Sequence, residues 1–306
     1  MKKLWTEAYR PKHVADVIFQ DDRQRSSFLR YVENGEIPNL LLSGAQGTGK
    51  TTTSRALIRD LKVDRIDVMR INASDENSVD DMREKIRNFA YTMPLGKFKV
   101  IQLEEADHLS FAAQAVLRTI IEDASDNARF VFTCNYVNKI IPALLSRLTQ
   151  YEFKAPCFDD VLLRAGEILI AEDVEFDEET LTKFVTVGYP DVRKVVSLLE
   201  EHSSNGRLNP PDGKRTDADW KFALIDLMEK GDLRTARKMV CENASREEVG
   251  DVYRFLYDNA HTIPKFKTQE KQEEAIVVIA EHLRDHSLVA DVEINLAACM
   301  VRLMLL

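Results

Sequence analysis

The chain has 306 residues, of which 44% are hydrophobic and 30% are charged, with a net charge of −9. This composition excludes a disordered or low-complexity chain and predicts no membrane-spanning segment, and the length predicts two or three domains. The charge is uneven, because residues 1–97 carry 17 Lys and Arg against 14 Asp and Glu, whereas the remainder carries 25 against 37. The acidic total therefore does not exclude nucleic-acid binding by a local basic surface.

The N-terminus, Met-Lys-Lys-Leu-Trp-Thr-Glu, has the charges of a signal peptide but lacks the apolar segment that follows them in one. We therefore expect a cytoplasmic or nuclear protein that is not secreted and makes no membrane contact. The four cysteines are far apart and form no CxxC pair, which argues against a zinc site and a disulfide framework. We expect reduced core cysteines at Cys134, Cys157, Cys241 and Cys299.

Short runs of β type alternate with helical segments from residue 39 to residue 153. Strands are predicted at 40–42, 66–71, 100–103, 130–133 and 151–153, and helices at 51–61, 79–91, 111–124 and 142–147. This alternation predicts an α/β domain, with a parallel sheet between two layers of helices.

Beyond residue 157 the β signal disappears and the periodicity is helical. Serine, asparagine, glycine and proline at 203–213 predict a linker, and further helices are predicted at 220–230, 233–241, 247–259, 269–284 and 292–305. We place three domains at 1–155, 156–205 and 214–306. The last segment, 294–306, is apolar nearly all round, so its helix is expected to be buried, in a bundle core or against neighbouring subunits.

Residues 44–51 read Gly-Ala-Gln-Gly-Thr-Gly-Lys-Thr after the first predicted strand, which is the arrangement of a P-loop. Glycines let the backbone N–H groups point at phosphate oxygens, where a Cβ would block the approach. Lys50 is expected to reach the β- and γ-phosphates, and the Thr51 hydroxyl to bind Mg²⁺. The alternative is a glycine-rich turn with a stray lysine. The residues predicted to bind ATP here are Gly44, Ala45, Gln46, Gly47, Thr48, Gly49, Lys50, Thr51 and Thr52.

Residues 99–107 read Lys-Val-Ile-Gln-Leu-Glu-Glu-Ala-Asp, a predicted buried strand that ends in acidic residues. Glu104 is predicted to hold Mg²⁺ through water, and Glu105 to polarise the attacking water. Most P-loop ATPases with a paired acid here carry aspartate first, so Glu104 adds one methylene where metal geometry is tight. Weak Mg²⁺ binding or slow turnover is one expectation, and a solvated acidic turn is the alternative interpretation.

Four further segments of the sequence match the motifs of a single protein family. They are Trp5-Thr6-Glu7-Ala8-Tyr9-Arg10-Pro11, Ile71-Asn72-Ala73-Ser74-Asp75-Glu76, Leu144-Leu145-Ser146-Arg147-Leu148 and Gly188-Tyr189-Pro190-Asp191-Val192-Arg193-Lys194. Together with the P-loop they resemble the AAA+ clamp-loader ATPases, specifically the small subunits of replication factor C and their phage equivalents. The resemblance covers residues 4–203 and implies a P-loop AAA+ domain, a small helical lid domain and an all-α collar domain.

The resemblance implies several site residues. Tyr9, Arg10 and Pro11 would pack near the adenine. The segment after residue 71 is similar to the family's DNA-facing junction, with Asn77-Ser78 where the family has a basic residue. The implied DNA contacts are therefore Asn77, Ser78, Arg83 and Arg87, although arginines on a charged helix are often only solvated.

Three more residues match polar groups that act on the γ-phosphate in the family. Asn135, at the end of the segment Phe130-Val131-Phe132-Thr133-Cys134-Asn135, resembles sensor 1, and a capping asparagine is the alternative. Arg147 matches the Ser-Arg-Cys motif, with Leu148 in place of the cysteine, and would act in trans as an arginine finger. Arg193 resembles sensor 2.

The implied activity is that of an ATP hydrolase that uses Mg²⁺. Its implied partners are a sliding clamp, primer-template DNA and other subunits in a five-membered ring. Ile120 and Ile121 are candidate clamp contacts, but a core stripe explains them equally well. Two alternatives are a structural subunit that binds ATP with weak hydrolysis, and another AAA+ DNA motor such as a branch-migration helicase or a helicase loader.

Overall fold

The computed structural model describes residues 3–74, 79–209, 219–243, 249–260, 263, 266, 268–286 and 288–306. Its contacts divide the chain into two compact units. The first comprises Met1–Glu172 with Gly188–Glu200, and the second Asp173–Val187 with Glu201–Leu306.

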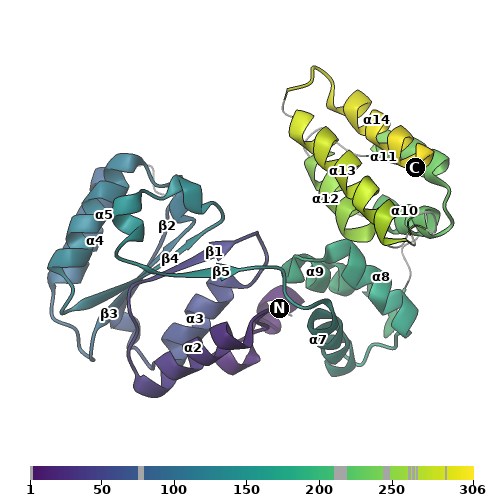
Figure 1. Ribbon diagram of the computed structural model, residues 1–306. Helices are drawn as coiled ribbons and strands as arrows, with labels where there is room; N and C mark the ends of the chain where they lie inside the picture. The colour runs from purple at the N-terminus through teal and green to yellow at the C-terminus, as the bar shows by residue number, and fades with distance from the viewer. Residues whose placement is uncertain are drawn as a thin grey trace. The chain divides into compact units, whose positions relative to one another are not determined.

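The first unit contains a five-stranded parallel sheet in the order β2-β3-β4-β1-β5 (Figure 1). The strands are β1 (Leu40–Gly44), β2 (Val68–Asn72), β3 (Lys99–Glu104), β4 (Ala128–Cys134) and β5 (Thr149–Phe153). Because parallel strands end at the same edge of a sheet, the segments that follow β1, β3 and β4 meet there. All five strands predicted from the sequence form.

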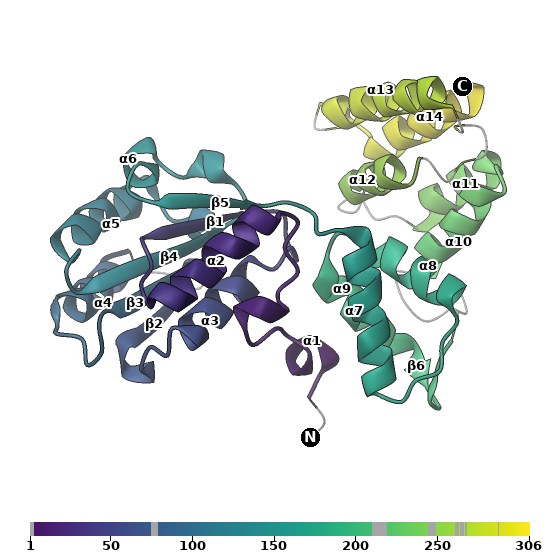
Figure 2. The ribbon, with the colours of Figure 1, turned by 60° about the horizontal axis from the view of Figure 1, so that its bottom comes forward.

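Helices cover both faces of the sheet, as Figures 1 and 2 show. One face carries α4 (Val79–Tyr91), α5 (Phe111–Asp123) and α6 (Pro142–Leu145). The other carries α2 (Asp22–Asn34) and α3 (Lys50–Asp60). The predicted three-layer α/β architecture is therefore confirmed, and α2 is a helix that the sequence reading missed.

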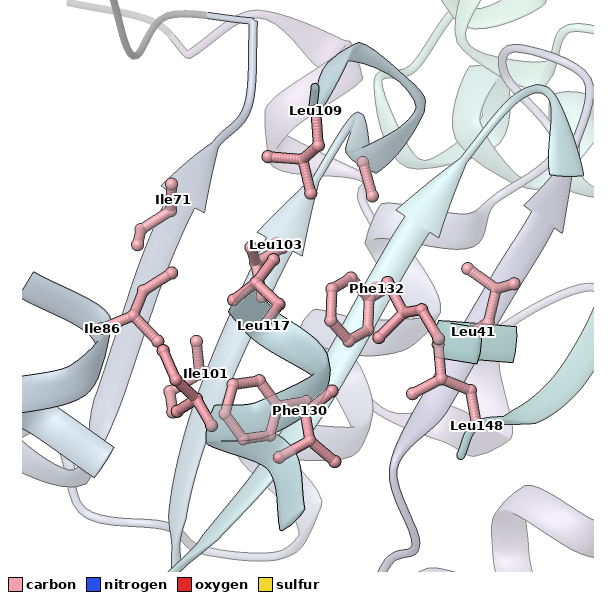
Figure 3. Close-up of a cluster of buried hydrophobic side chains, with 14 of the residues drawn as sticks. Leu41, Ile71, Ile86, Ile101, Leu103, Leu109, Leu117, Phe130, Phe132 and Leu148 are labelled. Atoms are coloured by element: carbon pink, nitrogen blue, oxygen red, sulfur yellow. The ribbon is translucent and has the colours of Figure 1, made fainter. Parts of the chain in front are cut away.

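Two hydrophobic cores lie on the two faces, because successive strand residues point in opposite directions. Leu41 packs in the core beneath α4 and α5, whereas its neighbours Leu40 and Leu42 pack beneath α2 and α3. In the first core, Ile86 and Leu117 from the helices meet Phe130 and other strand residues (Figure 3).

Ile120 and Ile121 of α5 also lie in this core, each with only 3% of its surface exposed. The prediction that they contact a clamp is therefore wrong for these side chains, since they pack inside the protein. Gln114, on the same helix, donates from Nε2 to the oxygens of Leu109 (3.1 Å) and Lys139 (3.0 Å). Its Oε1 accepts from the nitrogen of Ile141 at 2.8 Å, so it fixes the turn that leads into α6.

The first unit also includes α1 (Trp5–Ala8), α7 (Phe158–Ala171) and most of α9 (Val192–His202). Three bonds tie the N-terminal segment to these helices. The nitrogen of Trp5 donates to Glu200 (2.9 Å), the Tyr9 hydroxyl to Glu172 (2.9 Å), and Arg164 to the Tyr9 carbonyl (3.3 Å). Short 3₁₀ helices lie at Val14–Asp16, Arg65–Asp67, Ala106–His108 and Val137–Lys139.

The second unit is mostly helical. It contains most of α8 (Glu178–Gly188) together with α10 (Asp219–Glu229), α11 (Leu233–Asn243), α12 (Val249–Asn259), α13 (Gln269–Asp285) and α14 (Val292–Leu305). On α14, Cys299 and Met300 are fully buried, but Ile294 is 69% exposed and Leu305 81% exposed. Only one face of this helix is therefore buried within its own chain, and burial of the other face against neighbouring subunits stays a prediction.

A short antiparallel hairpin, β6 (Ser203–Ser204) with β7 (Arg207–Leu208), lies where the sequence predicts a linker. Its turn residues Asn205 and Gly206 have φ angles of 55° and 73°. Asn-Gly is the preferred pair for a two-residue turn with both residues at positive φ.

All four cysteines are free, and Cys157 is exposed, so it is not the core residue that the sequence led us to expect. Over the described residues, no helix has the length and apolar character needed to cross a membrane.

Candidate nucleotide-binding site

The loop between β1 and α3 is built on glycines in conformations that other residues rarely adopt. Gly44, Gly47 and Gly49 have φ angles of 142°, 75° and 95°. The Thr48 hydroxyl donates to the Ala45 carbonyl at 2.8 Å and closes the loop on itself. The loop then runs directly into the N-terminus of α3, where free N–H groups and the helix dipole favour an anion.

A side chain at position 44 is also excluded sterically, because a Cβ there would lie 2.0 Å from the carbonyl oxygen of Phe153 on β5. We expect Gly44→Ala to lower the free energy of unfolding by about 2–5 kcal/mol, from backbone strain plus overpacking. Gly49→Ala is the matched control, since it carries a positive φ but meets nothing within 4 Å. Denaturant unfolding checks this, and an equal loss in both variants would contradict the steric account.

Lys50 lies inside the loop with 8% of its surface exposed. Its Nζ donates to the carbonyls of Gly44 (2.8 Å) and Ala45 (2.6 Å). Burial lowers the pKa of Lys50, and the nearby Cys134, Asp107 and Asp191 act in the opposite direction. An anion bound in the loop would therefore stabilise the ammonium that burial disfavours.

The two acids at the end of β3 have different surroundings. The Oε1 atom of Glu104 accepts hydrogen bonds from Arg55 and from Gln102. The side chain of Glu105 is exposed, and the residue has the left-handed φ of 56°. Its carbonyl accepts from the His108 nitrogen at 2.9 Å, but its carboxylate makes no hydrogen bond or ion pair with any described residue. A free carboxylate on a strained backbone is typical of functional sites, and it suits Glu105 to accept a proton from water.

Asp107, which was not among the predicted site residues, contacts the cavity residue Asn135. It is 6% exposed, and its Oδ1 accepts from the backbone nitrogen of Asn135 at 3.3 Å. Its Oδ2 is buried without a partner among the described residues. Asp107 therefore joins the acidic segment to the polar residue that follows β4. The one sequence feature that could have indicated a role for Asp107 is its position three residues after Glu104.

A cavity of about 280 Å³ brings most of the predicted site residues together. Its lining includes Tyr9, Arg10, Pro11, Gln46, Gly47, Thr48, Gly49, Lys50, Thr51, Thr52, Glu105, Asn135 and Arg193. Four of the residues predicted for ATP, metal or catalysis are outside this lining. Gly44 and Ala45 form the base of the loop, and the other two are Glu104 and Arg147.

Apolar side chains, none of them among the predicted site residues, line another part of the cavity. They include Val17, Ile18, Ile168, Val192 and Val196. A planar, largely apolar base suits such a lining, while the charged loop suits phosphates. At the loop, a Cβ on Gly47 would lie 2.0 Å from Oδ1 of Asp191, so a carboxylate already packs against this glycine.

The family described as "ATPase family associated with various cellular activities (AAA)" has a model that matches residues 40–155. The replication factor C small subunit of Thermoplasma acidophilum is 38% identical over 215 residues, which cover 69% of this chain and 67% of that protein. The chain belongs to the replication factor C small-subunit family. It is therefore a clamp-loader ATPase that binds and hydrolyses ATP.

Other members of the replication factor C family show similar identity. The small subunit of Archaeoglobus fulgidus is 40% identical over 67% of this chain and 66% of its own length. A probable subunit 5 from Dictyostelium discoideum is 37% identical over 65% of this chain and 59% of its own length.

The fold is also similar to that of RuvB from Thermotoga maritima, a Holliday junction branch migration motor. The TM-score is 0.55 with 17% identity, over 72% of this chain and 73% of the other. At this identity the likeness shows the fold alone, so it gives no support to the branch-migration alternative.

In this replication factor C family member, Arg147 is absent from the lining of the cavity formed by its own chain. Its guanidinium pairs with Glu122 of α5 and donates to the Ala143 carbonyl (2.7 Å) and the Ser146 hydroxyl (3.0 Å). Arg147 is therefore held by residues of its own chain outside that cavity.

The DNA contacts implied for this clamp-loader subunit divide into two pairs. Asn77 and Ser78 lie outside the described residues. Arg83 and Arg87 are exposed on α4, and the Arg87 guanidinium lies 5.8 Å from the centre of the Tyr91 ring. Both arginines are accessible to a phosphate backbone.

Proposed function

We propose that this ATPase is one subunit of a five-membered ring that loads a sliding clamp onto primer-template DNA. With ATP bound, the ring would hold the clamp open and grip DNA, and hydrolysis would release the closed clamp on the DNA. The observation that supports this most is the division of the site. One cavity collects the P-loop, Glu105, Asn135 and Arg193, whereas Arg147 lies elsewhere on the chain.

The loop's residues fit ATP and Mg²⁺. Its glycines leave backbone N–H groups open to phosphate oxygens, and Lys50 provides a buried cation beside them. Thr51, at the start of α3, and Glu104, through water, would hold Mg²⁺. Mg²⁺ held by these residues would supply positive charge to offset that of the phosphates.

Hydrolysis would begin when Glu105 accepts a proton from water as the water oxygen attacks the γ-phosphorus. The bond from that phosphorus to the bridging oxygen breaks, and ADP leaves with the electron pair. Asn135 would orient the water, while Arg193 and the neighbour's Arg147 would balance the charge on the γ-phosphoryl oxygens.

The same contacts would couple ATP to the shape of the ring. Tyr9, Arg10 and Pro11 would pack near the adenine, while Arg193 and the neighbour's Arg147 would both contact the γ-phosphate. Loss of the γ-phosphate would remove the negative charge to which Arg193 and the neighbour's Arg147 both bind. In this proposal residues 1–155 are the ATP-binding domain, 156–205 the lid and 214–306 the collar that joins subunits.

DNA would be held by Arg83 and Arg87 of α4, which are exposed, with Asn77 and Ser78 as further candidates. Backbone contacts of this kind carry no sequence information, which suits a protein that must act at any primer end. The clamp contact has no candidate residue in this proposal, because Ile120 and Ile121 are buried.

ATP turnover by the assembled subunits, with and without clamp and primer-template DNA, tests the proposal. We expect turnover to rise when both are present, and the clamp to be retained on affinity resin only with a non-hydrolysable ATP analogue. If the rate of ATP turnover is the same with and without clamp and DNA, and no clamp is retained, the clamp-loading role is overturned.

A further inference from the structure

We propose that Arg55 and Gln102 are positioning residues for Glu104: they hold one carboxylate oxygen so that the other stays free for the water shell of Mg²⁺. This inference rests on the proposed role of Glu104 in holding Mg²⁺. It concerns the feature in which the chain departs from most P-loop ATPases, namely glutamate in place of the first aspartate.

The two carboxylate oxygens of Glu104 are used very differently. Oε1 accepts from Arg55 Nε at 3.2 Å, from Arg55 Nη2 at 2.9 Å and from Gln102 Nε2 at 2.9 Å. Oε2 accepts no hydrogen bond from any described residue, although the side chain is only 18% exposed. One oxygen is thus anchored by three donors, and the other is available to a ligand.

Gln102 connects this anchor to the helix that follows the P-loop. It is completely buried, and its Nε2 also donates to the Ser54 hydroxyl at 2.8 Å. Because that nitrogen faces two acceptors, the orientation of the amide is determined by its partners. Ser54 in turn donates to the carbonyl of Thr51 at 2.9 Å. A continuous chain of bonds therefore runs from Glu104 to the helical turn that carries the other proposed metal ligand.

Arg55 makes the second connection between the same two elements. It lies four residues after Thr51 on α3, so the two residues share one side of the helix. Its guanidinium, which is planar and always charged, approaches Oε1 through two of its N–H groups, which restricts the carboxylate more than a lysine ammonium could. The charge of Arg55 also offsets that of Glu104 while no metal is bound.

This arrangement explains how a longer acid can serve at position 104. Glutamate has one more rotatable bond than aspartate, so an unsupported carboxylate would lose more side-chain freedom when it binds. Arg55 and Gln102 remove that freedom in advance. An aspartate at 104 would be one methylene shorter and would lose reach toward Arg55.

Arg59 provides a matched control one turn further along α3. Both arginines line a second cavity of about 820 Å³, together with Arg10, Lys12, Arg65 and Arg70. Arg59 is exposed and makes no ion pair or side-chain hydrogen bond with a described residue. Arg59→Ala thus removes the same charge from the same basic cavity without touching Glu104.

The test measures the affinity for a fluorescent, non-hydrolysable ATP analogue in Mg²⁺ and in EDTA. The increase in affinity that Mg²⁺ causes is called the Mg²⁺ gain, and a titration gives the Mg²⁺ concentration at which half of this gain is reached. Arg55→Ala is expected to reduce the gain by about tenfold or more and to raise that concentration by a similar factor, as loss of an outer-shell partner does. Binding in EDTA should change little. Arg55→Lys and Gln102→Leu should give smaller losses, and Arg59→Ala none.

Two results would overturn the inference. One is an unchanged Mg²⁺ gain in Arg55→Ala, and the other is a larger gain, which would mean that Arg55 competes with the metal. Failure of the underlying proposal gives a different pattern, because the wild-type protein itself would then show no Mg²⁺ gain. Circular dichroism melting of each variant separates loss of fold from loss of metal affinity, and Arg55→Lys keeps the test valid if Arg55→Ala unfolds.

Discussion

Glu105→Gln is expected to lower ATP turnover by about 10²–10³-fold, because the amide cannot accept a proton from the attacking water. ATP binding should be nearly unchanged, since Gln has the same shape and the Glu105 carboxylate makes no hydrogen bond or ion pair with any described residue. Steady-state phosphate release, with clamp and DNA present, measures the first effect. Equilibrium binding of ATP measures the second.

Glu33→Gln is a suitable control for this change, because Glu33 is an exposed acid on α2 and is not in the cavity lining. It should leave turnover at the wild-type level. If Glu105→Gln also retained wild-type turnover, another base would be responsible. The chain would then fit the structural subunit that was the alternative interpretation of its sequence.

Lys50→Ala is expected to weaken ATP binding by about 10–100-fold, the value of a hydrogen-bonded charge lost from a site. The effect should be large because Lys50 is 8% exposed and, among the residues that the structure describes, no other lysine lines the cavity. Isothermal titration with a non-hydrolysable analogue measures it. Lys154→Ala, an exposed lysine just after β5, is the control and should bind normally. Equal affinities for Lys50→Ala and the wild type would place the phosphates elsewhere.

The α/β core could be predicted from the sequence because its signals are local. Each strand is a short apolar run, as in Leu40-Leu41-Leu42, and each is followed by a helical period. The P-loop and the acids at 104 and 105 were readable for the same reason, since parallel topology brings segments after β1 and β3 to one edge.

Contacts between distant residues could not be predicted in this way. The hydrogen bonds from Arg55 to Glu104 join residues that are 49 apart in sequence. The sequence around Arg55 and the sequence around Glu104 do not predict these bonds. Asp107 was passed over because an acid in a turn is usually solvated, whereas here it is buried beside Asn135. Ile120 and Ile121 show the converse, because an apolar helix end fits a surface contact and a core equally well until the packing is known.

The hairpin at residues 203–208 was missed for a different reason. Its two-residue strands are too short to give a period, and serine, asparagine and glycine there are equally typical of a linker. The Asn205-Gly206 pair was the available signal.

The central claim is that two chains complete one ATP site, and mixing two inactive variants tests it most directly. Arg147→Ala keeps its own ATP pocket but has no finger, and turnover should fall by about 10³-fold or more. Lys50→Ala cannot bind ATP well but still carries Arg147. Assembled together with the cognate partner subunits, with native mass confirming mixed rings, the two variants should recover turnover well above either variant alone. Mixed rings that are no more active than the better single variant would contradict the claim that Arg147 acts in trans.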